Sequence, residues 1–331
     1  MTEPGLVIVD KPGGMTSHDV VARIRRLAGT RRVGHAGTLD PMATGVLVIG
    51  IEQATRLLGH LALTQKEYAA TIRLGQSTVT DDAQGDPLPA PDQATAASDV
   101  GTDPLRAALA ELTGQIVQVP PKISAIKVGG QRAYRLARSG GDPELAARTV
   151  TVWRLDLTGT RPAGEFLDVD VIVTCSSGTY IRAIARDLGA ALRTGGHLTA
   201  LRRTRVGPYQ ISAARTLDQL AGGLDIIPMA QAAAAAFGCL RLTAQEARLV
   251  AHGGRLPAAG RAAESPAGES PDAASAGRAA EFPPGAVAAA ASAAAVRPLA
   301  ALDPDSNLVA LLEERNGELA PIAVFPPSAV P

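Results

Sequence analysis

The sequence contains few of the residues that build disulfide frameworks, metal sites and aromatic cores. Its 331 residues include two cysteines, Cys175 and Cys239, and five histidines without metal-ligand spacing, so neither a disulfide framework nor a zinc site is expected. The chain also lacks a P-loop and a glycine-rich dinucleotide fingerprint. We therefore expect no metal and no cofactor. Aromatic residues make up only 3% of the chain, so each one invites a specific explanation.

Long apolar runs are absent as well. None approaches the roughly 18 residues that a membrane-spanning helix needs, although apolar residues make up 46% of the chain and suffice for a buried core. The start of the sequence lacks the basic and apolar regions of a secretory signal peptide. These absences favour a cytoplasmic protein with no membrane partner.

The net formal charge is zero, but the charged residues are unevenly distributed. Residues 76–112 hold seven acids and one base, and residues 258–306 hold six acids and three bases. The remaining chain is therefore basic, and its bases cluster in residues 11–32, 122–138 and 193–205. Clustered lysines and arginines are typical of a surface that binds nucleic-acid phosphates. Three solvated basic faces are the alternative explanation.

Apolar periodicity predicts an α+β fold. Residues 5–10 have the composition of a buried strand, and residues 66–74 and 167–175 alternate apolar and polar side chains as half-buried strands do. Apolar positions at helical spacing predict one helix that begins near Ser17 and another after residues 178–179. No regular strand–helix–strand rhythm is visible, which favours a mixed, largely antiparallel central sheet with flanking helices.

Composition divides the chain into two predicted domains. Residues 1–228 form the larger one, with a flexible loop at 85–104 that is rich in Asp, Pro and Ala. Residues 229–331 form a smaller domain, interrupted at about 257–298 by a low-complexity insertion of Ala, Gly, Pro and Ser. Such a sequence has too few large apolar residues to offset the entropy of ordering. After the insertion, the Asn-Gly dipeptide at 316–317 predicts a hairpin turn between two strand-like runs.

Residues 34–45 form the most distinctive segment. Three glycines lie among its twelve residues, around His35 and Asp40, and glycine lets a backbone approach a neighbouring group closely. Pro41 restricts the backbone directly after Asp40. A carboxylate on such a rigid loop is suited to act as a nucleophile or a general base. The alternative is a turn or a helix cap, which is the common role of an isolated Asp-Pro pair.

This segment resembles the signature of the pseudouridine synthases, specifically of the family that contains the bacterial tRNA pseudouridine-55 synthases. Further segments resemble motifs of that family, follow in its order and together span about residues 5–228. They are residues 9–17, 66–68, 118–121, 124–127, 175–182 and 201–203. Residues 229–331 resemble, less closely, the small PUA-like RNA-binding domain of the family. The resemblance thus implies a catalytic pseudouridine synthase domain over 1–228, followed by a PUA-like domain.

The resemblance implies that the chain isomerises a uridine in the T-arm of tRNA, at position 55, to pseudouridine. In that reaction the N1–C1′ glycosidic bond breaks, the base turns, and C5 bonds to C1′. No redox change, group transfer or energy input occurs, so the resemblance also implies that no cofactor is needed. The expected partner is tRNA, and we expect a monomer with no obligate protein partner.

The same resemblance assigns roles to three catalytic residues. Asp40 matches the essential aspartate, which either attacks the sugar or the base, or removes the C2′ proton to give a glycal; it must be ionised for either route. Arg182 matches the arginine that pairs with this aspartate, although a surface helix position is the alternative. Tyr68 matches the tyrosine that stacks on the extruded base, although a strand tyrosine is often a core residue.

Four further residues are expected at this site from the resemblance. His35 is expected to contact the T-loop or to help hold the flipped base out, unless it binds only its own backbone. Lys11 and Tyr180 are expected to line or support the pocket, and Leu201 to form its apolar wall. The chain departs from the family at Ile123, where many relatives have an aromatic residue, so one wall of the pocket is left undefined.

Five arginines are expected to contact RNA phosphates, with a solvated surface as the alternative. They are Arg202, Arg203 and Arg205, together with Arg132 and Arg135.

Three other functions compete with the synthase. A tRNA-binding folding factor would bind RNA without needing Asp40 and Arg182 together. A guide-RNA-dependent relative would usually carry extra N-terminal sequence and lysine-rich tails. A hydrolase would need a second acid, a triad or a metal set beside Asp40. The sequence has both synthase residues and lacks the features of the last two classes, so the synthase is the favoured function.

Overall fold

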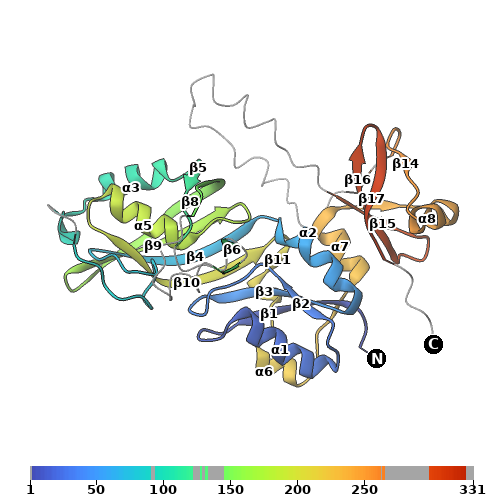
Figure 1. The fold of residues 1–331 in the computed structure, drawn as a ribbon, viewed down its shortest axis with the longest axis horizontal. Helices are drawn as coiled ribbons and strands as arrows, with labels where there is room; N and C mark the ends of the chain where they lie inside the picture. Colours follow the sequence, from blue (N-terminus) through green and yellow to red (C-terminus); the bar gives the residue numbers. More distant parts are fainter. Residues whose placement is uncertain are drawn as a thin grey trace.

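The computed structural model describes most of the chain, and Figure 1 shows a larger sheet and a smaller C-terminal sheet with helices packed between and around them. The described residues are 2–90, 94–121, 127–128, 131–132, 145–261, 263–264 and 298–325. For residues 127–128 and 131–132 only the backbone is described, as the two short strands β6 (Lys127–Val128) and β7 (Gln131–Arg132).

The larger sheet has ten strands and is mixed. Its main path runs in the order β12-β1-β3-β10-β4-β9-β8-β5, while β2 pairs with β3 and β11 pairs with β10. Within the described residues, its pairings are antiparallel except that β3 and β10 run parallel. This confirms the predicted α+β fold with a largely antiparallel sheet. The strands are β1 (Gly5–Lys11), β2 (Val33–Ala36), β3 (Thr44–Ile51), β4 (Lys66–Leu74), β5 (Gly114–Gln118), β8 (Arg148–Ala163), β9 (Phe166–Cys175), β10 (Gly196–Val206), β11 (Tyr209–Gln210) and β12 (Ile227–Pro228).

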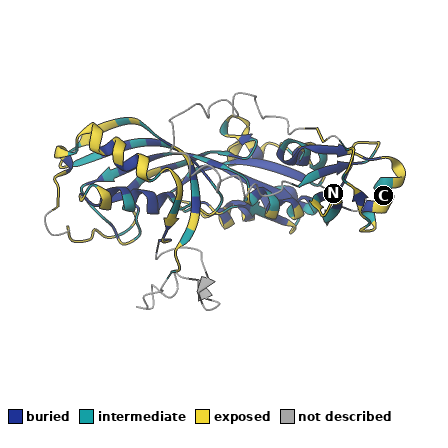
Figure 2. Cartoon of the chain, turned by 90° about the horizontal axis from the view of Figure 1, so that it is seen from above, coloured by how far each residue is buried: buried dark blue, intermediate teal, exposed yellow. Residues whose placement is uncertain are grey.

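Two hydrophobic cores lie on opposite faces of this sheet, because side chains alternate along a strand. In β1, Val7 and Val9 belong to a core that includes residues of α1, α3, α5 and α6. Leu6 and Ile8 belong to a second core that includes residues of α2 and of α7 (Met229–Phe237). Figure 2 shows the buried strands running between these layers. The helices and helical turns on the larger sheet are α1 (Ser17–Ala28), η1 (Glu52–Leu57), α2 (Leu58–Ala62), η2 (Ala97–Asp99), α3 (Thr102–Glu111), α5 (Ile181–Ala191), η3 (Ile211–Ala213) and α6 (Leu217–Ala221).

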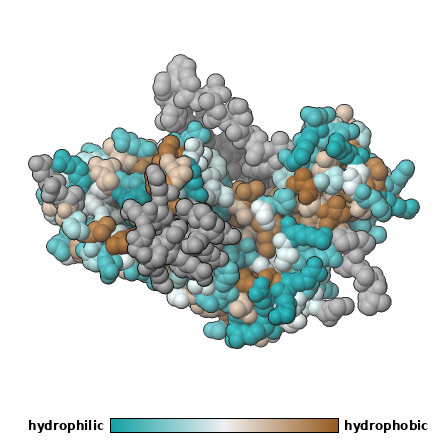
Figure 3. Space-filling view, viewed as in Figure 1, coloured by the Kyte–Doolittle hydropathy of each residue, from teal (hydrophilic) through white to brown (hydrophobic). Residues whose placement is uncertain are grey.

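Helix α1 starts where the sequence predicts a helix. Thr16 accepts a hydrogen bond from the Asp19 backbone, the Asp19 side chain accepts from the Thr16 backbone, and Gly29 ends the helix in the left-handed conformation. Its apolar stripe is buried, and its arginines lie on the outer side. In Figure 3 the area at the bottom of the molecule, where Figure 1 places α1, is accordingly hydrophilic.

The prediction of a flexible loop over residues 85–104 is wrong for its second half. That part contains η2 and the first turn of α3. Ala97 is only 2% exposed and packs in the core beside Leu105, and the Thr95 amide donates to the carbonyl of Arg193. A single small residue is enough to attach this Asp- and Pro-rich stretch to the core, and composition averaged over twenty residues does not reveal it.

The smaller sheet is built from residues on both sides of the predicted insertion. Its five strands run in the order β13-β15-β16-β17-β14, with β13 and β15 parallel and the other pairs antiparallel. Residues 316–317 join β16 to β17 with φ values of 54° and 78°, which confirms the predicted Asn-Gly turn. The elements are α7 (Met229–Phe237), β13 (Cys239–Arg241), α8 (Ala244–Ala251), β14 (Leu256–Pro257), β15 (Leu299–Leu302), β16 (Leu308–Arg315) and β17 (Glu318–Val324).

The smaller sheet shares a core with the larger one. Phe237 of α7, Leu302 of β15 and Phe325 pack in the same cluster as Leu6 of β1. The predicted start of the insertion at residue 257 is too early, because the backbone of Glu264 still pairs with Cys239 of β13. Residues 265–297 lie outside the described residues. None of the helices in the described ranges is both long and apolar enough to cross a membrane.

Candidate active site

Residues from distant parts of the sequence meet at one cavity of about 270 Å³. Its lining comes from the loop before β3, from β4 and β10, from the last residue of α2 and the first of β8, and from the segment that leads into α5 with the first turn of that helix. Six residues predicted for the site are among those that line it: Asp40, Tyr68, Tyr180, Arg182, Leu201 and Arg203. The structure therefore brings together the three residues expected to act in catalysis and two of those expected to bind substrate.

A two-point ion pair joins Asp40 to Arg182. The Nε of Arg182 lies 3.0 Å from Oδ2 of Asp40, and Nη2 donates to Oδ1 at 3.2 Å. The Arg182 side chain is 5% exposed, whereas that of Asp40 is 33% exposed and lines the cavity. A planar guanidinium that holds both carboxylate oxygens fixes the orientation of the carboxylate. The pair thus presents the Asp40 carboxylate to the cavity in one defined orientation.

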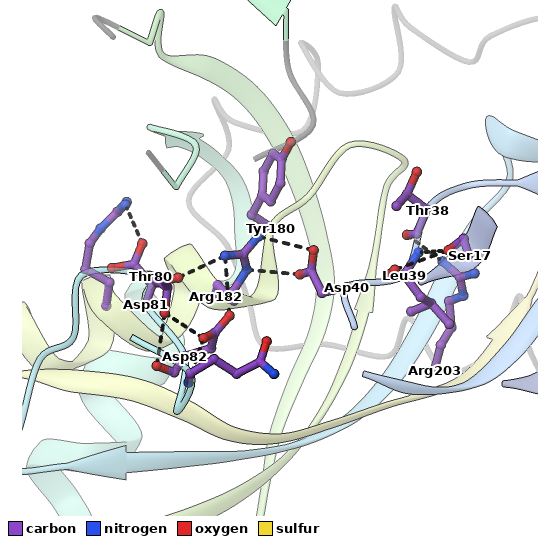
Figure 4. A network of polar contacts seen from close by, with 12 residues as sticks. Ser17, Thr38, Leu39, Asp40, Thr80, Asp81, Asp82, Tyr180, Arg182 and Arg203 are labelled. Carbon is purple, nitrogen blue, oxygen red and sulfur yellow. Dashed lines mark hydrogen bonds and ion pairs between the residues drawn. The ribbon is translucent and has the colours of Figure 1, made fainter. Parts of the chain in front are cut away.

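Arg182 also contacts an acidic turn that the sequence did not single out. Its Nη1 donates to the carbonyl of Thr80 at 2.9 Å and lies 3.4 Å from Oδ2 of Asp82, so the guanidinium stands between two carboxylates (Figure 4). Asp82 is buried, and its carboxylate accepts hydrogen bonds from the Thr80 hydroxyl and from the backbone amide of Gln84. In the sequence this turn belongs to an acidic stretch, and only the adjacent Asp pair at 81–82 sets it apart.

Arg203 anchors the loop that carries Asp40. It is fully buried, and its guanidinium donates to the carbonyls of Val46 at 2.7 Å, Gly37 at 3.1 Å and Thr38 at 3.4 Å. The prediction that Arg203 contacts an RNA phosphate is therefore wrong, because its donors are used inside the protein. Gly45 makes this arrangement possible, since a Cβ there would lie 2.2 Å from the Arg203 carbonyl oxygen.

Two residues near the N-terminus hold the same loop from the other side. The Ser17 hydroxyl donates to the carbonyl of Leu39 and accepts from its amide. Lys11 is fully buried, and its ammonium donates to the carbonyls of Pro12, Met15 and Pro41. Burial lowers the pKa of Lys11 to about 8. Lys11 is not among the residues that line the cavity, so of its two expected roles the structure shows support of the loop.

The sequence that builds this site is similar to that of known proteins. The profile described as TruB family pseudouridylate synthase (N terminal domain) matches residues 25–181, and that described as tRNA pseudouridylate synthase B C-terminal domain matches residues 182–227. A tRNA pseudouridine synthase B of Thermobifida fusca (strain YX) is 54% identical over 325 residues, which cover 97% of this chain and 98% of the relative. The chain belongs to the TruB family of pseudouridylate synthases. It is a pseudouridine synthase, and so an isomerase.

Other relatives agree with this assignment. A tRNA pseudouridine synthase B of Mycobacteroides abscessus is 58% identical over 266 residues, covering 78% of this chain and 88% of the relative. A solved structure of an H/ACA RNP bound to a substrate RNA containing 2′-deoxyuridine is similar with a TM-score of 0.64 and 26% identity, covering 98% of this chain and 85% of that one. A Cbf5-Nop10-Gar1 complex is similar with the same TM-score and 27% identity, covering 97% and 83%.

In this TruB-family synthase, Tyr68 lies on β4 with 7% of its surface exposed and lines the cavity. Burial raises the pKa of its hydroxyl, so the phenol stays protonated at neutral pH. Lys66, two residues earlier on the same face of the strand, donates to the carbonyls of Ala62 and Thr64. Burial lowers the pKa of Lys66 to about 8. Tyr68 thus offers a neutral aromatic ring in a cavity that is otherwise rich in cations.

Tyr180 is held by two neighbouring strands of the synthase. The amide side chain of Gln118, which is fully buried, donates to the Tyr180 carbonyl at 3.0 Å and accepts from its backbone amide at 2.8 Å. The guanidinium of Arg148 lies over the Tyr180 ring, 4.5 Å from its centroid. Gln118 occurs in a motif that carried the resemblance, but no role was expected of its side chain. Arg148 was not predicted at all.

The other predicted residues lie away from the cavity lining. His35, on β2, is half-buried with its ring 5.6 Å from that of His18, and burial lowers its pKa. Arg202 is partly exposed and paired with Asp10 at 2.7 Å. Arg205 is partly exposed and donates to the carbonyl of Gly207. Three positions fall where the side chain is not described: Arg132, Arg135 and Ile123. Across the described residues, no group of three or more His, Cys, Asp and Glu side chains is placed to hold a metal ion.

Proposed function

We propose that this chain isomerises uridine 55 in the T-arm of tRNA to pseudouridine. One observation carries the proposal: the exposed edge of the Asp40 carboxylate, held by Arg182, faces the same cavity as the ring of Tyr68. The names of the relatives supply the class of RNA, since those 54–58% identical are tRNA pseudouridine synthases B. The position in the T-arm rests on the family resemblance of residues 34–45.

The target nucleotide must leave the RNA stack, because a base inside a helix cannot reach a recessed carboxylate. An extruded uracil loses stacking with its neighbours, and the Tyr68 ring offsets part of that loss. Leu201, which is 7% exposed and lines the cavity, provides apolar contact. We infer that recognition depends on the shape of the T-arm and on bases that are already splayed, as is common for RNA-binding proteins.

In the chemical step, the ionised Asp40 acts on the extruded nucleotide. In the nucleophilic route a carboxylate oxygen bonds to C1′ as the N1–C1′ bond breaks; the base then turns, C5 bonds to C1′ and the Asp40–C1′ bond breaks. In the glycal route Asp40 takes the proton from C2′ as the base leaves, and returns it after C5 has bonded to C1′. In both routes the C5 proton is lost and N1 gains a proton, so substrate and product are isomers. Arg182 keeps the carboxylate oriented in either case.

The decisive test compares the wild type with Asp40→Asn on an unmodified tRNA transcript, using carbodiimide labelling and primer extension to locate pseudouridine. We expect a single stop in the T-loop with the wild type and a rate at least about 10³-fold lower with the variant, since a positioned base or nucleophile contributes on that order. Retained tRNA binding in a filter assay is the control for folding. An active Asp40→Asn enzyme would remove Asp40 from the mechanism.

Two competing functions give different results in the same assay. A tRNA-binding folding factor would bind the transcript but leave no stop, with or without Asp40. A guide-dependent synthase is favoured by the similarity to a Cbf5-Nop10-Gar1 complex, and it would act only when protein and RNA partners are added. We propose that the purified chain acts alone as a monomer, so a stop in the absence of any other macromolecule is the expected outcome.

A further inference from the structure

Arg148 occupies a position in the cavity that the proposed chemistry does not use. It is the first residue of β8, opposite Gln118 in the β5–β8 ladder, and its side chain lines the cavity that contains Asp40. Its guanidinium is stacked on the ring of Tyr180, whose backbone Gln118 clamps. This stacking holds the plane of the guanidinium in place, as a binding group requires.

The donors of Arg148 are buried without acceptors. Its Nε and Nη2 atoms have no contact with solvent and no hydrogen-bond partner among the described residues. Burying such donors without partners costs free energy, and native proteins rarely leave them so unless a ligand or water completes the site. The other cations of the cavity differ, since Arg203 and Lys66 donate to backbone carbonyls and Arg182 holds Asp40.

The charge of the cavity indicates what kind of ligand fits these donors. The residues that line it include one carboxylate, Asp40, and four basic side chains, of which Arg182 already pairs with that carboxylate. No ion pair of Arg148 occurs within the described part of the chain, so its positive charge is not balanced by a neighbouring acid. A guanidinium fork in this state is best matched by an oxyanion with two oxygens in one plane, such as a phosphodiester.

We propose that Arg148 and the ring of Tyr180 form a subsite for a phosphate that flanks the target uridine. Nε and Nη2 are covered in the free protein, and they donate to the two non-bridging oxygens of this phosphate once the entering nucleotide displaces what covers them. The inference rests on the proposed function, because an extruded nucleotide brings its own phosphates to the mouth of the cavity. The subsite supplies a backbone contact beside Asp40, and so positions the sugar whose C1′ reacts.

The test uses T-arm stem-loop RNAs with a single methylphosphonate 5′ or 3′ of the target uridine, which removes one phosphate charge. The protein is the full chain, as wild type, Arg148→Gln or Arg148→Lys. We expect Arg148→Gln to lower kcat/KM about 10- to 100-fold on unmodified RNA, the range for a lost charge-assisted contact. One of the two methylphosphonates should lower the kcat/KM of the wild type by a similar factor, and it should cause little further loss of kcat/KM in Arg148→Gln. Arg148→Lys keeps the charge but loses the two-pronged geometry of the guanidinium, so its kcat/KM should lie between those of the wild type and Arg148→Gln.

Arg154→Gln is the matched control, since it removes an exposed arginine from the same strand. It should leave both kcat/KM and the melting temperature unchanged. The phosphate subsite is overturned if neither methylphosphonate lowers the kcat/KM of the wild type. It is also overturned if each methylphosphonate lowers kcat/KM by the same factor in the wild type and in both Arg148 variants. The first of these results does not depend on how any variant folds. A wild type that forms no pseudouridine in the unmodified RNA contradicts the proposed function instead.

Discussion

The two walls of the cavity hold their basic side chains in different ways. In the loop wall, formed by residues 37–40 with Arg203 and Lys66, the cations donate to backbone carbonyls. In the helix wall, formed by residues 177–182 with Arg148, buried donors of Arg148 lack acceptors within the described residues. The loop wall is complete before RNA arrives, whereas the helix wall is completed by a ligand. Loss of a cation should therefore reduce stability on the first wall and activity on the second.

The largest expected effect is the loss of stability in Arg203→Met. The change leaves the buried carbonyl of Val46 and the partly buried carbonyls of Gly37 and Thr38 without their donor, and we expect the free energy of unfolding to fall by roughly 3–5 kcal/mol. Chemical denaturation measures it. Arg202→Met is the matched control. Arg202 is the neighbour of Arg203 in the sequence, but it is partly exposed, and its ion pair with Asp10 is worth at most about 1 kcal/mol. If Arg203→Met destabilises the protein no more than Arg148→Gln does, the contrast between the walls is lost.

A smaller effect is expected for Asp82→Asn, which tests how Arg182 is held. The amide preserves the shape of the turn, but one of the two carboxylates beside Arg182 loses its charge. We expect kcat to fall about 10- to 100-fold with little change in melting temperature, since a charge-assisted contact contributes on that scale. Single-turnover kinetics on saturating tRNA measures it. Asp86→Asn, an exposed acid a few residues on, should behave as the wild type; equal losses in both variants would argue for a general charge effect.

The smallest effect concerns pH and Lys66. Its pKa is about 8 in the folded protein against 10.5 when unfolded, so between these values the unfolded chain binds more protons and stability rises with pH. Over this window we expect the free energy of unfolding of the wild type to rise, relative to that of Lys66→Met, by up to about 1.4 kcal/mol per pH unit. Below about pH 8 we expect no such difference in slope. Denaturant titrations of both proteins at several pH values test it. The contribution of Lys11 is common to both and cancels, so parallel curves would show that Lys66 does not titrate there.

Much of the loop wall and helix wall was predictable from the sequence. Asp40, Tyr68 and Arg182 lie in segments with strong family resemblance, and the alternation in residues 66–74 already placed Tyr68 on the apolar face of a strand. The largely antiparallel sheet followed from the same alternation and from the absence of a regular strand–helix rhythm.

The partners of these residues were not predictable, because they depend on which strands meet. Arg202 and Arg203 are adjacent in a basic run and look equivalent, yet they point to opposite sides of β10. The loop that carries Asp40 covers one of those sides, and Arg203 points into it. This contact arises because β10 lies beside β3, the strand that follows the loop, and the sequence does not reveal that pairing. Asp82 contacts Arg182 of α5, and Arg148 stacks on Tyr180; both are tertiary contacts for which local sequence carries no signal.

The arrangement of the smaller sheet has a consequence for how this protein tolerates change in length. Glu264 and Ala300, which stand before and after residues 265–297 in the sequence, both pair with the same residue, Cys239. They therefore lie on either side of one strand, and the sheet fixes the distance between them. When the two ends of a segment are held in this way, doubling the length of a flexible connection costs only about 0.6 kcal/mol of chain entropy. We therefore expect gains and losses of residues between these two positions to be nearly neutral for folding, and a reporter protein inserted there to leave the catalytic cavity undisturbed.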